Sequence, residues 1–126
     1  MTKKSQKVNK MINEELQQWF EHTDALVGEL LEDGTNEDVY HTIEHHFASE
    51  NFDLLEKAAI AAFKLGFEIE EPEEAELENG DKIFAFDIVT EQMLNAELLK
   101  AETKKMFELA QQCKVDYDGW GTYFEE

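Results

Sequence analysis

The sequence predicts an α+β fold of the ferredoxin-like (split βαβ) type: a four-stranded antiparallel sheet with an additional N-terminal helix. Two observations favour this class. After a first amphipathic segment, the spacing of apolar residues switches between the periods of strand and helix in the order βαββαβ. Between the second and third strands stands Asn79-Gly80, a strong two-residue hairpin signal. Two crossovers and one hairpin then suggest the sheet order 4-1-3-2, in which the first strand is internal.

The length of 126 residues favours one domain with one core. We assign residues 1–8 to a basic flexible tail and residues 9–126 to a single α+β domain. Within this domain, residues 9–33 form the N-terminal helix and residues 38–126 form the βαββαβ core.

The N-terminal helix is predicted from an apolar stripe at i, i+3 and i+4 spacing. The stripe comprises Ile12, Leu16, Trp19, Thr23, Leu26 and Leu30. Gly34 marks its end, because glycine readily adopts the left-handed cap conformation. Thr23-Asp24 is also a helix-start signal, which leaves open a division into two pieces.

The first strand of the core is Tyr40–Ala48, a stretch rich in β-branched and aromatic residues. Period-two alternation gives this strand two faces. One face carries Val39, His41, Ile43, His45 and Phe47, and the other carries Tyr40, Thr42, Glu44 and His46. We expect the remaining elements to pack around this internal strand.

A helix follows, for which Ser49 is the expected N-cap and Gly66 the end. Its predicted buried stripe is Phe52, Leu55, Ala59, Ala62 and Phe63. The next strand begins at Phe67 and continues weakly over residues 73–78. Pro72 restricts this strand to an edge of the sheet or bends it, because proline cannot donate to the ladder.

The third strand, Lys82–Val89, is apolar on both faces and is therefore expected to be central. Either Thr90 or Asn95 caps the last helix. The stripe of this helix is Leu99, Thr103, Met106, Leu109, Ala110 and Cys113. The final strand is Val115–Phe124.

The net charge of −19 restricts the kinds of partner. The chain has 30 acidic residues against 11 basic ones, and every basic residue is lysine. Such a surface repels nucleic acid backbones and attracts basic proteins, so we expect no direct nucleic acid partner. The alternative is that the acidity serves only to keep the protein soluble.

The compartment is indicated by cysteine use and hydropathy. Cys113 is the single cysteine, so it cannot form an internal disulfide, and a reducing cytoplasm fits. No apolar run approaches the ~20 residues that a membrane span needs, and the basic N-terminus is not followed by the apolar segment of a secretory signal. We therefore expect a cytoplasmic protein without a membrane partner.

Metal sites find little support. His41 and His45 would lie about 13 Å apart on one strand face, and His45 and His46 point to opposite faces. The spacing of Asp116 and Asp118 resembles a calcium loop, but Lys114 occupies the first ligand position, and the chain ends before a second helix. We predict no metal and no cofactor.

An enzyme remains an alternative. His45 beside Glu44 or Asp87 would be a general base. However, the chain contains no nucleophile elbow, phosphate loop or dinucleotide fingerprint. We therefore predict no catalytic residues.

The most specific local feature is Trp120 between Gly119 and Gly121. One interpretation is a core tryptophan beside bulge glycines. The other is an aromatic anchor at a binding surface, framed by Asp116 and Asp118 on the same strand. We predict a partner-binding patch from these strands that comprises Glu44, His45, His46, Asp116, Asp118, Trp120, Tyr123 and Phe124.

Several segments together resemble the regulator of ribonuclease E activity B family over roughly residues 25–126. They are Leu31–Gly34 (LEDG), Thr42–His46 (TIEHH), Ala58–Gly66 (AAIAAFKLG), Phe67–Ile69, Leu94–Leu98 and Tyr117–Glu125 (YDGWGTYFE). The TIEHH and YDGWGTYFE strings are the most specific.

This resemblance implies an acidic cytoplasmic protein that binds the largely disordered C-terminal scaffold region of RNase E. Binding would inhibit cleavage, slow RNA turnover and alter the make-up of the RNA degradosome. The family brings no established catalytic site, and we expect a monomer. The alternatives are a small cytosolic enzyme with a His/carboxylate acid–base site and an acidic nucleic-acid mimic.

Overall fold

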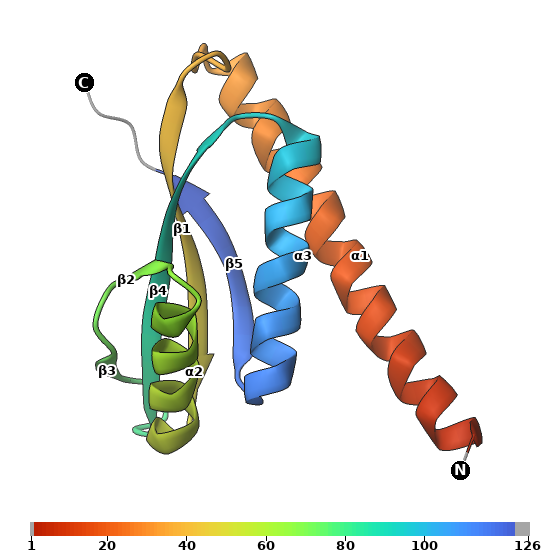
Figure 1. The fold of residues 1–126 in the computed structure, drawn as a ribbon, viewed down its shortest axis with the longest axis vertical. Coiled ribbons are helices and arrows are strands. Elements are labelled where there is room, and N and C mark those ends of the chain that lie inside the picture. Colours follow the sequence, from red (N-terminus) through yellow and green to blue (C-terminus); the bar gives the residue numbers. More distant parts are fainter. Residues whose placement is uncertain (1, 123–126) are drawn as a thin grey trace.

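The computed structural model describes residues 2–122, with side chains from Asn13 on. Three helices and five strands follow one another along the chain (Figure 1). They are α1 (Thr2–Glu32), β1 (Tyr40–Ser49), α2 (Phe52–Lys64), β2 (Glu68–Ile69), β3 (Glu73–Glu76), β4 (Lys82–Met93), α3 (Ala96–Cys113) and β5 (Asp116–Thr122).

The strands form one antiparallel sheet in the order β2-β4-β1-β5, and β3 also pairs with β4. The predicted α+β class is confirmed, and β1 is internal as expected. The predicted count of four strands is wrong, because Pro72 separates the second predicted strand into β2 and β3. Proline lacks the N–H that a continuous ladder would need. The ferredoxin-like assignment stays a prediction.

α1 is one continuous helix of 31 residues that runs alongside α3 (Figure 1). It begins at Thr2, so the prediction of a tail over residues 1–8 placed the helix start too late. Thr23 does not start a second piece. Gly34 has a φ of 90° just after the helix, as expected. None of the helices within residues 2–122 has the length and apolarity that a bilayer crossing requires.

The starts of α2 and α3 are capped by asparagines. Asn51 accepts a hydrogen bond from the Leu54 N–H, whereas Ser49, the predicted cap of α2, is the last residue of β1. Asn95 caps α3 in the same way, and Thr90 lies within β4. A side-chain oxygen at the N-cap satisfies one of the free N–H groups of the first turn.

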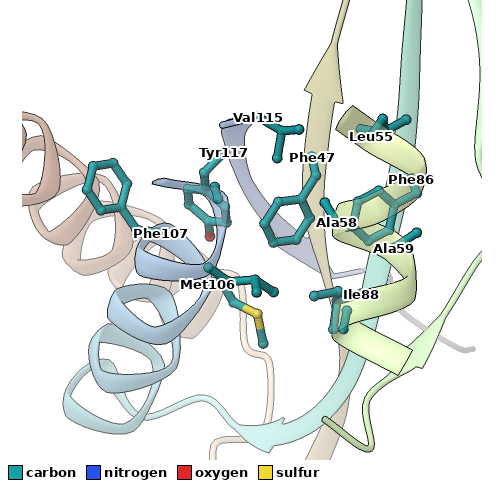
Figure 2. Packing of buried hydrophobic residues seen from close by; sticks show 13 residues of the cluster. Phe47, Leu55, Ala58, Ala59, Phe86, Ile88, Met106, Phe107, Val115 and Tyr117 are labelled. Atoms are coloured by element: carbon teal, nitrogen blue, oxygen red, sulfur yellow. The ribbon is translucent and has the colours of Figure 1, made fainter. Parts of the chain in front are cut away.

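The main core lies between the inner face of the sheet and the helices α2 and α3 (Figure 2). Phe47 of β1 stacks on Phe86 of β4 with their ring centroids 5.0 Å apart. α2 contributes Leu55, Ala58, Ala59 and Ala62. The predicted burial of Phe52 and Phe63 is wrong, since their exposed fractions are 41% and 68%. The small alanines let α2 lie close to the sheet, so its larger side chains remain outside.

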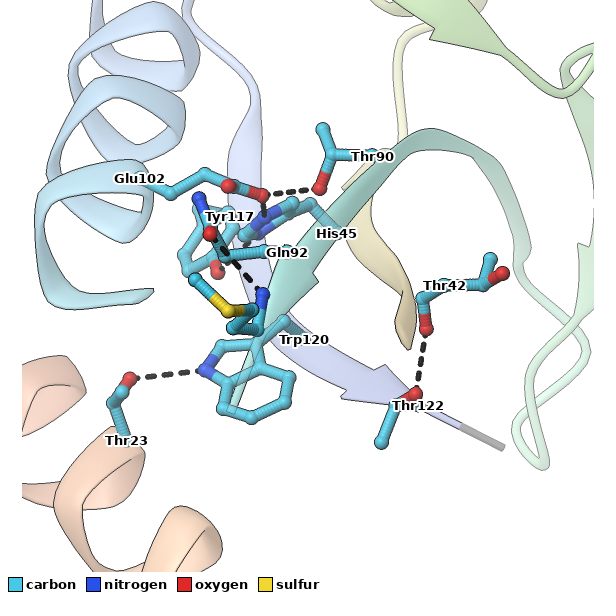
Figure 3. A network of polar contacts seen from close by, with 10 residues as sticks. Thr23, Thr42, His45, Thr90, Gln92, Glu102, Tyr117, Trp120 and Thr122 are labelled. Atoms are coloured by element: carbon cyan, nitrogen blue, oxygen red, sulfur yellow. Dashed lines mark hydrogen bonds and ion pairs between the residues drawn. The ribbon is translucent and has the colours of Figure 1, made fainter. Parts of the chain in front are cut away.

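A second cluster joins α1 to the sheet around Trp120. This indole is 4% exposed, and its Nε1–H donates to the Thr23 hydroxyl of α1 over 2.9 Å (Figure 3). Of the two interpretations of Trp120, the core tryptophan is therefore confirmed. Buried indoles usually satisfy their N–H in this way.

A β-bulge in β5 decides the direction of Trp120. Tyr117 is opposite Phe47, but Trp120 is opposite His45, so two residues of β5 face the single residue His46 of β1. Gly119 in this bulge has a φ of 95°, which side-chain-bearing residues rarely adopt. The extra residue turns Trp120 inward, whereas strict alternation would have placed it beside Asp116 and Asp118.

We predict that Gly119→Ala destabilises the fold by about 1–3 kcal/mol. An added Cβ would require the same unfavourable φ and would lie 3.0 Å from the Trp19 ring. Gly121→Ala is the matched control, since its φ is not in the left-handed region and its nearest atom lies at 3.9 Å. Urea unfolding of both variants measures the difference, and equal stabilities would contradict a need for glycine at the bulge.

Candidate functional site

The sheet separates the predicted partner-binding residues onto two faces. His45 and Trp120 point to the inner face beneath the helices, and both are buried. Glu44, His46, Asp116 and Asp118 lie on the outer face, where no strand side chain is buried. The remaining members of the predicted patch, Tyr123 and Phe124, lie outside the described residues.

The centre of the outer face is a cluster of one histidine and several carboxylates from β1, β4 and the β2–β3 connection. His46 is directly opposite Asp87 in the β1–β4 register, and its Nδ1 lies 2.9 Å from the Asp87 carboxylate. Carboxylate oxygens of Glu44, Glu70 and Asp87 lie within 4.8 Å of one another. Partial burial, a hydrogen bond with Asp87 and the nearby charge of Glu70 raise the pKa of Glu44.

Carboxylates extend from this cluster across the outer face. We call this surface the acidic face, and it comprises Glu44, Glu68, Glu70, Glu73, Asp87, Glu91, Asp116 and Asp118. The single lysine within the strands, Lys82, lies opposite Glu76 on the inner side of the sheet. The acidic face therefore carries many carboxylate acceptors and few basic side chains that would neutralise them. Such a surface can bind lysine or arginine side chains or a cation.

The inner face carries a buried polar network instead (Figure 3). His45 is fully buried, with Nδ1 3.0 Å from the Tyr117 hydroxyl and Nε2 2.7 Å from the Glu102 carboxylate. The Thr90 hydroxyl donates to the same carboxylate oxygen. The network thereby connects β1, β4, β5 and α3 through His45 and Glu102.

The network favours an ionised Glu102. Burial alone raises the pKa of this carboxyl, but the hydrogen bonds from His45 and Thr90 outweigh burial and lower it below its usual range. Burial also raises the pKa of the Tyr117 hydroxyl, which therefore keeps its proton. A histidine beside a carboxylate is a common acid–base pair, but a fully buried one has no access to a substrate.

The partners of the two histidines differ from those expected. His45 was expected beside Glu44 or Asp87, but its partner is Glu102, and Asp87 pairs with His46. Glu102 was not predicted at all. Glu102 lies three residues after Leu99 and one before Thr103, and both of these residues belong to the buried stripe of α3. This spacing is the signal that would have placed Glu102 near the sheet.

We predict that Glu102→Gln lowers the free energy of unfolding by about 1–3 kcal/mol at neutral pH, because it weakens a charged hydrogen-bond network. The folded-state pKa of Glu102 lies below its ordinary value of 4.5. The stabilisation is therefore present above about pH 4.5 and is lost as the pH falls through the folded-state pKa. Stability curves of the two proteins should converge in acid, while the exposed control Glu108→Gln stays near wild type throughout.

Comparison with known proteins places the chain in a family. The family model described as Regulator of ribonuclease activity B matches residues 20–122. A protein of that name from Colwellia psychrerythraea is 81% identical over 116 residues, which cover 92% of this chain and the whole relative. One from Aeromonas hydrophila is 53% identical over 89% of this chain and 97% of the relative.

A more distant relative of the same name, from Escherichia coli, is 48% identical over 113 residues. These residues cover 90% of this chain and 82% of the relative. The matched region contains every strand of the sheet and most of the helices, including both faces described above. The chain therefore belongs to the Regulator of ribonuclease activity B family.

Proposed function

We propose that this protein regulates the endoribonuclease RNase E by binding the enzyme's C-terminal scaffold region, and that binding slows RNA turnover. The support for a ribonuclease as the target is the family, since its members are named as regulators of ribonuclease activity. The choice of RNase E and of its scaffold region rests on the sequence resemblance. We further propose that the protein acts in the cytoplasm as a monomer.

The observation that carries the proposal is the acidic face. A protein with a net charge of −19 and no arginine is poorly suited to hold RNA, because its field repels phosphates. Control of an RNA-cutting enzyme would then work through contact with the enzyme itself. A scaffold segment rich in lysine and arginine is complementary to the acidic face. We propose Glu44, His46, Asp116 and Asp118 as contact residues.

A small acid–base enzyme has less support. The histidine that would act as its base, His45, is fully buried, and its two ring nitrogens already have partners in Tyr117 and Glu102. The hypothesis that the acidic face mimics a nucleic acid also has less support. At the centre of this face, three carboxylates lie within 4.8 Å of one another. They form a compact cluster rather than a line of charges at phosphate spacing.

Binding should depend on the scaffold region and on salt. Purified protein should bind full-length RNase E and not a version that lacks the scaffold region. The association rate should fall about tenfold between low salt and physiological salt, because exposed charges are screened beyond about 8 Å at physiological ionic strength. Surface plasmon resonance measures both. Equal binding to the two forms of the enzyme would overturn the choice of partner region.

The acidic face can be tested separately with variants of equal charge. Glu44→Gln/Asp116→Asn/Asp118→Asn removes three charges from this face. Glu14→Gln/Glu15→Gln/Glu21→Gln removes three exposed charges from α1. We expect the first variant to associate with RNase E several-fold more slowly than the second at low salt, since nearby charges steer the encounter. The same loss in both would show that net charge alone matters, and a loss only in the second would move the site to α1.

A further inference from the structure

An apolar groove lies at the β2 edge of the sheet, on the same side as the helices. It runs between α2 and the segment around β2. Its volume is about 360 Å³, and it is lined by Phe52, Glu56, Ala59, Ile60, Phe63, Ile69, Glu71 and Pro72. α2 and β2 lie beside each other at this edge (Figure 1). The groove contains none of the residues assigned above to the acidic face or to the His45 network.

α2 carries two apolar stripes, of which the fold uses one. The buried stripe consists of small and medium side chains that pack on the sheet. The second stripe, Phe52, Ile60 and Phe63, lies along the groove at helical spacing, with exposed fractions of 41%, 46% and 68%. Large apolar side chains gathered in one exposed groove are typical of an interaction site, and aromatic residues are frequent energetic centres of interfaces.

The charges around the groove specify the occupant. Both charged residues that line it, Glu56 and Glu71, are carboxylates. The segment that forms its far wall is strongly acidic, since seven of the eleven residues 68–78 are glutamate. An occupant therefore needs apolar side chains for the floor of the groove and lysine or arginine at its flanks. A second copy of this chain would bring two such acidic segments together, which like-charge repulsion opposes.

We infer that this groove binds a short amphipathic segment of the ribonuclease, with apolar side chains facing Phe63 and Ile60 and basic residues facing the glutamates. The inference rests on the proposed function and adds a second contact to it. The acidic face accelerates the encounter, while the groove holds the bound segment by burying apolar area. Its docking mode is that of an amphipathic segment laid in a hydrophobic groove.

The test uses the double variant Phe63→Ala/Ile60→Ala and the full-length RNase E. Leu98→Ala is the matched control, because Leu98 is a large apolar residue of α3, is 42% exposed and lies outside both the groove and the acidic face. All three changes are at exposed positions, so the melting temperatures should stay near that of the wild type. Affinity is measured for each protein at low salt and at physiological salt.

We expect the double variant to bind about tenfold or more weakly at both salt concentrations, mainly through faster dissociation, because salt does not screen an apolar contact. The control should bind like the wild type. Wild-type affinity of the double variant would overturn the inference and leave the proposed function standing. A wild-type protein that binds RNase E at neither salt concentration overturns both. Self-association that the double variant abolishes would assign the groove to a second copy, against this inference.

Discussion

The structure depends on the two-residue alternation of β1 between β4 and β5. Because both edges of this strand are paired, each of its side chains must lie either beneath the helices or on the outer face. Ile43, His45 and Phe47 are buried, while Glu44 and His46 are not. A register slip of one residue would bury the acidic side chains and expose the core ones, which makes the register strongly specified.

The bulge in β5 adapts the partner strand to this constraint. Tyr117 and Trp120 are three residues apart, so a regular strand would send them to opposite faces. The extra residue at Gly119 brings both rings inward, where Tyr117 reaches His45 and Trp120 reaches Thr23. The conformation of Gly119 thus allows β5 to contribute both to the buried polar network and to the contact with α1.

The inner and outer faces of the sheet therefore differ in their chemistry. The inner face holds the fold together through a core and a hydrogen-bonded histidine, both closed to a partner. The outer face concentrates carboxylates, and partial burial together with the neighbouring Asp87 and Glu70 raises the pKa of Glu44. Such a face suits a basic protein partner, and the apolar groove at the adjacent edge has a chemistry that carboxylates alone cannot supply.

The sequence by itself determined the α+β class, the order of the elements apart from the division of the second strand into β2 and β3, and the internal position of β1. It also determined the glycine ends of the first two helices and the strong negative charge. These features follow from periodicity, turn residues and charge, which are local or summed properties. Only the tertiary structure decided that His45 pairs with Glu102 and His46 with Asp87, since such pairs depend on register and helix placement. Alternation along β5 grouped Trp120 with Asp116 and Asp118, and the bulge reversed that grouping. The exposure of Phe52 and Phe63 was likewise decided by packing: α2 has apolar residues around more than one face, and only its contact with the sheet selects which face is buried.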